Sequence, residues 1–162
     1  MSDSYYDVAQ ICENGHVVNS SAREFPTSNS PFCATCGAKT IMACPSCAAP
    51  IRGYYHVPDV ISFDHYTAPA FCHQCGTPFP WTDAALAAAS ELAGVLEGLS
   101  EQEREELKKT LGDLVRETPR TRVAETKFKS IMRKARKDGY DAMKSVLTDV
   151  LSETVKKTLF GA

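Results

Sequence analysis

The spacing of hydrophobic positions divides the chain into two parts that meet near residue 80. From residue 83 onward the apolar side chains recur every three or four positions, which is the period of an amphipathic helix. Up to residue 80 they form only short runs, which eight of the nine prolines interrupt. Because proline disrupts helices and central strands, we expect little regular structure in the first part.

Three to four helices are predicted in the second part. The first covers residues 83–99, which are rich in the strong helix formers alanine and leucine. Thr82 or Asp83 is placed to cap its beginning. The next helix begins after Ser100, because Ser100 and Glu103 have the spacing of a capping box.

The remaining helical segments follow Pro119, a residue suited to a first helical turn. A third helix is expected over residues 119–137, where Asp138-Gly139 breaks or bends it. A broad apolar stripe then runs from Met143 to Leu159. This stripe must be buried, either inside the chain or against a partner, so self-association is a prediction to test.

Short strands are expected in the first part at residues 17–18, 40–42 and 54–57, where β-branched and aromatic residues gather. Such short strands enclose little hydrophobic core. A region of this kind depends on another source of stability, and its cysteines suggest a bound metal.

All seven cysteines lie before residue 76 and fall into regularly spaced groups. Three are Cys-x-x-Cys pairs, in which two intervening residues let both sulfurs reach one ion. The remaining cysteine stands four positions before a histidine, with a glycine to ease the turn between them. Zinc prefers four nitrogen or sulfur ligands, so the groups predict two structural zinc ions. The eight expected ligands are Cys12, His16, Cys33, Cys36, Cys44, Cys47, Cys72 and Cys75.

The ligand groups can combine in two ways. Sequential pairing joins the first group with the second and the third with the fourth, whereas a cross-brace alternates them. We favour sequential pairing, because each half then ends in Phe-Cys-x-x-Cys-Gly, with Phe32 and Phe71 placed to shield a site from water. Buried free cysteines, a redox Cys-x-x-Cys and an iron–sulfur cluster are alternatives. No thioredoxin-like pattern surrounds the pairs, and the usual cluster spacings are absent.

The segments Cys44-Pro45-Ser46-Cys47 and Phe71-Cys72-His73-Gln74-Cys75-Gly76 together resemble a zinc ribbon. The stretch from Cys12 through Pro78-Phe79-Pro80-Trp81-Thr82 also resembles an uncharacterised bacterial family of small multi-cysteine proteins. The resemblance covers about half of the chain. It implies tandem zinc ribbons and no particular activity, since ribbons occur in proteins of many functions. We therefore predict an α+β protein, with a β-poor double zinc-ribbon domain at residues 1–80 and a helical domain at 83–162.

The net charge of −2 conceals a strongly basic segment at residues 119–137, which holds eight cations and one acid. The neighbouring helix is acidic at its start. The segment is therefore either a solvated face balanced by its neighbour or a contact for phosphate or an acidic partner. Its cations are Arg120, Arg122, Lys127, Lys129, Arg133, Lys134, Arg136 and Lys137.

We expect a non-enzymatic adaptor that binds a protein partner. Four ligands would close each zinc site, and common nucleophile, phosphate-loop and metalloprotease motifs are absent from the sequence. Aromatic residues between Tyr54 and Phe71 form either a contact patch or a small core. The alternative is a nucleic-acid-binding regulator that uses the basic segment. The sequence lacks a long apolar run and begins with polar, acidic residues 1–7, so we expect a cytoplasmic protein without a membrane span.

Overall fold

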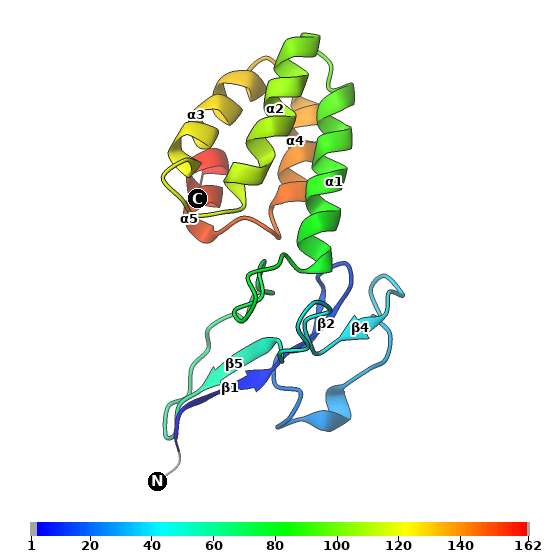
Figure 1. Ribbon diagram of the computed structural model, residues 1–162, viewed down its shortest axis with the longest axis vertical. Helices are drawn as coiled ribbons and strands as arrows, with labels where there is room; N and C mark the ends of the chain where they lie inside the picture. The colour runs from blue at the N-terminus through cyan, green and yellow to red at the C-terminus, as the bar shows by residue number, and fades with distance from the viewer. Residues whose placement is uncertain (1–2, 162) are drawn as a thin grey trace. The chain divides into compact units, whose positions relative to one another are not determined.

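The computed structural model describes residues 3–161, and residues 1, 2 and 162 of the expected domains lie outside this part. The chain forms two compact units, Met1–Thr82 and Asp83–Ala162. Strands occur only in the first unit of the described chain, while helices make up the second (Figure 1). The expected α+β class is therefore confirmed.

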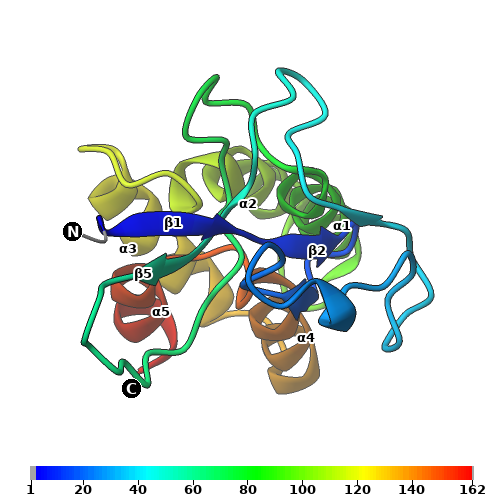
Figure 2. The ribbon, with the colours of Figure 1, turned by 90° about the horizontal axis from the view of Figure 1, so that it is seen from below.

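The first unit contains two small antiparallel sheets. One sheet pairs β1 with β5, and the other has the order β3-β2-β4. Figure 2 shows that β1 leads directly into β2, so one stretch of chain contributes a strand to each sheet. The three expected strand segments are present, whereas β1 and β2 were not expected. The elements are β1 (Tyr5–Val8), β2 (Gln10–Cys12), β3 (Val17–Asn19), the short 3-10 helix η1 (Pro26–Ser28), β4 (Thr40–Ile41) and β5 (Arg52–His56).

Buried polar side chains order the long connection between β3 and β4. The Asp7 carboxylate is 3% exposed and accepts hydrogen bonds from the backbone N–H groups of Val8, Arg23 and Glu24. The Asn19 amide donates to the Phe25 carbonyl and to the side chain of Asn29. These bonds satisfy backbone groups that a short-stranded unit cannot pair in a sheet.

The apolar core of the first unit surrounds the second pair of cysteine groups. Cys44 and Cys72 are buried in one cluster with Ile51, and the stacked rings of Phe79 and Trp81 belong to it, with centroids 4.7 Å apart. The Trp81 indole N–H donates to the Pro69 carbonyl at 2.9 Å. Sulfur ligands and hydrophobic side chains thus share one small core.

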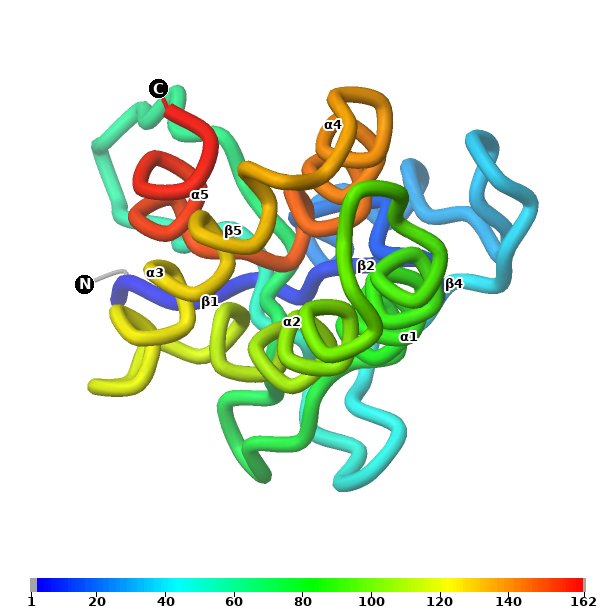
Figure 3. Tube along the Cα trace, turned by 90° about the horizontal axis from the view of Figure 1, so that it is seen from above, coloured from blue at the N-terminus to red at the C-terminus, as the bar shows by residue number. Residues whose placement is uncertain are grey.

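The second unit consists of helices that pack through an apolar interior. Helix α3 contacts both α2 and α5, and Figure 3 shows these helices along their axes. The capping box of Ser100 and Glu103 is present as expected. The helices are α1 (Pro80–Val95), α2 (Glu101–Leu114), α3 (Thr121–Met132), α4 (Lys137–Leu147) and α5 (Glu153–Phe160).

The expected beginning of the first helix was wrong. Helix α1 begins at Pro80. Proline is tolerated there because the first N–H groups of a helix have no partner within the helix, so the N–H that proline lacks is not needed. Thr82 does not cap the helix, and its hydroxyl instead donates to the Ala70 carbonyl at 2.8 Å.

The described part of the helical unit, up to residue 161, has five helices, so the expected number of three to four was too low. The third helix ends at Met132 and not at residue 137. Gly139 lies inside α4, where an added Cβ would come within 2.6 Å of a Leu96 methyl carbon, so this glycine permits close packing and does not break a helix. Ser152 divides the expected last helix, since its hydroxyl accepts the Val155 N–H and begins α5.

The apolar stripe at the end of the chain is buried within the helical unit. Its buried members lie on α4, on α5 and in the turn between them. The stripe therefore needs no second copy of the chain to cover it. These residues are Met143, Leu147, Val150, Leu151, Val155 and Leu159.

Candidate metal centres

The three Cys-x-x-Cys pairs adopt one backbone design. In each pair, the backbone N–H of the first cysteine donates a hydrogen bond to the carbonyl of the residue five positions later. The carbonyl of the same first cysteine accepts a hydrogen bond from the N–H of the residue four positions later. The residue before the first cysteine forms an isolated bridge with the residue seven positions further on. These bridges are Phe32 with Lys39, Ala43 with Pro50, and Phe71 with Pro78.

A left-handed residue follows the second cysteine in every one of these turns. Gly37 and Gly76 have φ of 74° and 73°, as their position after the cysteine predicts. The third turn places Ala48 in the same conformation, with φ of 62°. Sequence reasoning missed this position, because alanine gives no signal for a positive φ.

The group nearest to the N-terminus differs from these pairs, because a histidine four positions after Cys12 takes the place of the second cysteine. Cys12 ends β2 and His16 precedes β3, so a tight turn joins the two ligands. Gly15 has φ of 90°, and an added Cβ would lie 2.9 Å from the Cβ of Trp81. This turn therefore requires glycine for its conformation and for its close approach to the tryptophan.

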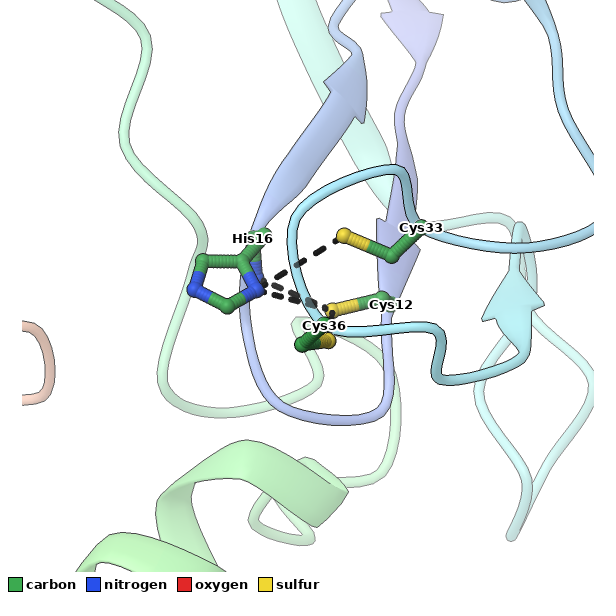
Figure 4. A group of neighbouring side chains, drawn as sticks. All are labelled: Cys12, His16, Cys33 and Cys36. Atoms are coloured by element: carbon green, nitrogen blue, oxygen red, sulfur yellow. Dashed lines mark hydrogen bonds between the residues drawn. The ribbon is translucent and has the colours of Figure 1, made fainter.

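The first cluster joins the groups nearest to the N-terminus (Figure 4). The His16 Nδ1 lies 3.5 Å from the Cys12 sulfur and 3.7 Å from the Cys33 sulfur. The sulfurs of Cys12 and Cys36 are 3.8 Å apart. Burial raises the pKa of Cys12, and the backbone N–H of His16, which donates to the Cys12 sulfur, opposes this effect only in part.

The second cluster contains four cysteines. The sulfurs of Cys44 and Cys75 are 3.8 Å apart, and those of Cys47 and Cys72 are 3.7 Å apart. All the ligand atoms of each cluster lie within 4.8 Å of one another. The structure thus groups the eight expected ligands in the sequential order and not as a cross-brace.

These separations fit a tetrahedral metal ion. Zinc–sulfur bonds of about 2.3 Å place tetrahedral sulfurs about 3.8 Å apart, and a zinc–nitrogen bond of about 2.05 Å gives an S···N edge of about 3.6 Å. Five ligand–ligand separations of 3.5 to 3.8 Å agree with these values, and the remaining separations lie within 4.8 Å. They are far longer than a disulfide bond of about 2.05 Å. Both clusters can therefore hold a metal ion.

Neighbouring donors favour the thiolate at one exposed cysteine of each cluster. The Asn14 amide, 3.4 Å from the Cys36 sulfur, and the Ala38 backbone N–H lower the pKa of Cys36 to about 6. The Thr77 hydroxyl and N–H lower the pKa of Cys75 to about 6. Although the Ala49 N–H favours the thiolate of Cys47, burial and the three nearby sulfurs raise its pKa to about 12. Crowded thiolates resist joint ionisation unless a cation shares the site.

The two phenylalanines before the cysteine pairs do not form equivalent covers. Phe32 is 60% exposed, so the expectation that its ring shields the first site was wrong. Phe71 is partly buried. The other histidines, His56, His65 and His73, belong to neither cluster.

The basic segment does not form one helix. Only Arg122, Lys127 and Lys129 lie within α3, while Arg120 and Arg133 flank its ends. Most of the eight cations contact carboxylates of the helical unit, as described below. Among the described helices, none has the length and apolar character that crossing a membrane requires.

Fold and site together define a two-unit α+β protein whose first unit carries two compact cysteine and histidine clusters suited to metal. The model of a family described as "Uncharacterized protein conserved in bacteria (DUF2321)" matches residues 5–159. The chain therefore belongs to this family, and the resemblance noted in the sequence is confirmed. Searches of the curated proteins and of the solved structures found no match.

Proposed function

We propose that the first unit binds two structural zinc ions and serves as a rigid, non-enzymatic platform for a protein partner. The observation that carries the metal assignment is that four sulfur or nitrogen ligand atoms gather within 4.8 Å in each cluster, with several of them at the edge length of a zinc tetrahedron. Thiolate and imidazole donors are the set that zinc prefers. Reduced cysteines of this kind suit the cytoplasm, which is where we place the protein.

A structural role follows from the ligand count. Each cluster supplies four protein ligands, so zinc would have no open position for water or substrate. Cys44 and Cys72 also belong to the apolar core, so metal and hydrophobic packing would stabilise the same region. Zinc would therefore hold the unit in one conformation, and catalysis is not part of the proposal.

The surface beside β5 supports the partner assignment. Tyr6, Tyr55, Val60 and Tyr66 help to line a depression of about 540 Å³. Arg52 lies over the Tyr6 ring, with its guanidinium carbon 4.6 Å from the ring centroid. Stacked aromatic and arginine side chains of this kind are enriched where proteins bind one another.

The loop that follows β5 presents apolar side chains to solvent. Val60, Ile61 and Phe63 are 60%, 83% and 95% exposed. Single exposed apolar residues are common on protein surfaces, but exposed apolar residues that are contiguous often mark an interaction site. Tyr66, by contrast, packs against the core, so the expected aromatic cluster divides into a core part and a contact part.

Metal analysis of freshly purified protein tests the first half of the proposal. We expect two equivalents of zinc per chain, and one equivalent after Cys33→Ser or Cys72→Ser. A native preparation without bound zinc, folded to the same degree with and without a chelator, would show the zinc assignment to be wrong.

Site-specific photo-crosslinking in the native host tests the second half. A photoreactive phenylalanine analogue at position 63 is expected to give a discrete protein adduct, while the same analogue at the exposed position 149 is not. The adduct should disappear in a Cys72→Ser background, because the platform loses its zinc. Identical adduct patterns from positions 63 and 149 would refute the partner surface.

Nucleic-acid binding has less support. Most cations of the basic segment already contact carboxylates of the same unit, which removes charge that phosphate would otherwise use. Residues 3–80 contain more acidic than basic residues, so the first unit offers no cationic surface of its own.

A further inference from the structure

The cations of the basic segment divide into two sets. Five of the eight form ion pairs with carboxylates on α2, on α4 or in the turn after α1. Within residues 3–161, Arg122, Lys129 and Arg133 form no ion pair. The five pairs are Arg120 with Asp113, Lys127 with Glu106, Lys134 with Glu103, Arg136 with Glu97, and Lys137 with Asp141.

The three unpaired cations lie on one face of α3. Helical residues advance by about 100° each, so Arg122, Lys129 and Arg133 fall within about 40° of one another and extend over about 16 Å. Arg133 keeps helical backbone angles at the C-cap, with φ of −62° and ψ of −26°, and therefore continues this face. All three side chains are exposed. We call this set the α3 stripe.

The α3 stripe borders a depression between α3 and α5, which are in contact. One hollow of about 580 Å³ is lined by Arg122, Lys129 and Thr158, among others. A second of about 430 Å³ is lined by Lys129, Arg133 and Thr158, with Phe128, Met132 and Leu159 beneath them. The hollows share Lys129 and Thr158 and therefore adjoin. We call the two adjoining hollows the groove, which has cations along its edge and apolar residues in one hollow.

We propose that this groove binds an acidic segment of a partner protein, whose carboxylates pair with the α3 stripe and whose apolar side chain enters the hollow above Phe128. Arginine guanidinium groups match carboxylates geometrically, and the lysine ammonium between the two arginines adds a third positive charge. The site lies on the helical unit, so it does not depend on the zinc platform.

Charge in the groove favours a carboxylate-bearing segment over a nucleic-acid backbone. Glu117 and Glu125 line the same groove and would repel closely spaced phosphates. Residues 83–162 contain 15 basic and 14 acidic residues, so the unit lacks the net positive field that attracts nucleic acid. A peptide can place discrete carboxylates opposite the three cations and avoid both glutamates.

Fluorescence anisotropy with the full chain tests the proposal. The probe is a labelled helical peptide of about 16 residues, with leucines on the same side as three glutamates. The glutamates are seven and four residues apart, like the three cations of the α3 stripe, and a second peptide has the two spacings in reverse order. A matched peptide carries glutamine in place of each glutamate. A single-stranded RNA and a DNA duplex of similar charge serve as competing probes.

Two triple variants with equal charge loss are compared. One removes the α3 stripe by Arg122→Gln, Lys129→Gln and Arg133→Gln. The control changes three cations outside the groove by Lys109→Gln, Lys137→Gln and Lys157→Gln. Circular dichroism and thermal unfolding establish that both variants remain folded.

We expect saturable binding of the acidic peptide that weakens with salt and falls about tenfold in the stripe variant, as the loss of three exposed ion pairs implies. The control variant should bind within about twofold of the native chain. No saturable binding by the native chain, or equal losses in both variants, overturns the proposal. Tighter binding of RNA or DNA than of the peptide, lost in the stripe variant, would identify a nucleic-acid surface instead.

Discussion

The left-handed residue at the end of each Cys-x-x-Cys turn provides a quantitative test of the second metal centre. Its two turns use different residues at this position, with Ala48 at φ 62° and Gly76 at φ 73°. A left-handed conformation costs a residue with a Cβ about 1–2 kcal/mol. Glycine avoids this cost but loses about 0.5–1 kcal/mol more chain entropy on folding. We therefore expect Ala48→Gly to stabilise the turn by about 0.5–1 kcal/mol and Gly76→Ala to destabilise it by a similar amount.

The geometry separates this backbone effect from packing. An added Cβ at Gly76 would meet no other atom of the described residues within 4 Å, so Gly76→Ala introduces no clash. Ala48 is exposed, so removal of its methyl group changes little buried surface. Gly37→Ala, whose Cβ also meets open space, is the matched change at the first centre.

Zinc affinity, measured by competition with a chromophoric chelator, reports these changes because metal binding and folding are coupled. A change of about 0.7 kcal/mol corresponds to roughly a threefold change in affinity. Ala48→Gly should tighten zinc binding by about this factor, and Gly76→Ala should weaken it. Weaker binding in Ala48→Gly, or unchanged binding in Gly76→Ala, would contradict a left-handed conformation at these positions.

Further predictions concern metal loading and stability in both units. Cys33→Ser and Cys72→Ser should each remove one zinc equivalent, and elemental analysis of the purified variants checks this. Asp7→Asn should destabilise the first unit by about 1–3 kcal/mol, because a buried acceptor of backbone N–H groups loses its charge, and denaturant unfolding measures the loss. Lys134 and the Ser100 cap lower the pKa of Glu103 in the folded protein. The ionised Glu103 carboxylate therefore stabilises the fold fully above its unfolded pKa of about 4.3, and this stabilisation disappears as the pH falls through the folded pKa. Glu103→Gln, which keeps the cap, should therefore lower the melting temperature at neutral pH and leave it unchanged near pH 2; an equal decrease at both would refute the ion pair.

The metal ligands could be predicted because their chemistry is local. The spacing of a Cys-x-x-Cys turn and the glycine after it are visible within a few residues, as at Cys33 and Cys72. Helices α1 and α2 were also recognisable, because alanine-rich composition and the Ser100 cap act within one or two turns. Such signals need no knowledge of distant contacts.

The features that sequence reasoning missed depend on contacts between distant segments. The sequence of strand β1 shows no clear alternation of apolar and polar residues. Its position is determined by its pairing with β5 and by the hydrogen bonds that Asp7 accepts from the backbone N–H groups of residues 23 and 24. Gly139 looks like a helix breaker until Leu96 is placed against it. The division of the basic residues into paired and unpaired sets required the positions of α2, of α4 and of the turn after α1.

The contact between Gly15 and Trp81 gives the protein an intrinsic optical reporter. Trp81 is the chain's single tryptophan, and the turn that carries Cys12 and His16 lies directly against it. Loosening of that turn would admit water to the indole and shift its emission to longer wavelength. Trp81 also packs in the core with Cys44 and Cys72, so its emission can report loosening at either centre in real time, without any attached dye. The signals of Cys36→Ser and Cys72→Ser give the separate baselines for loss of the first and of the second centre.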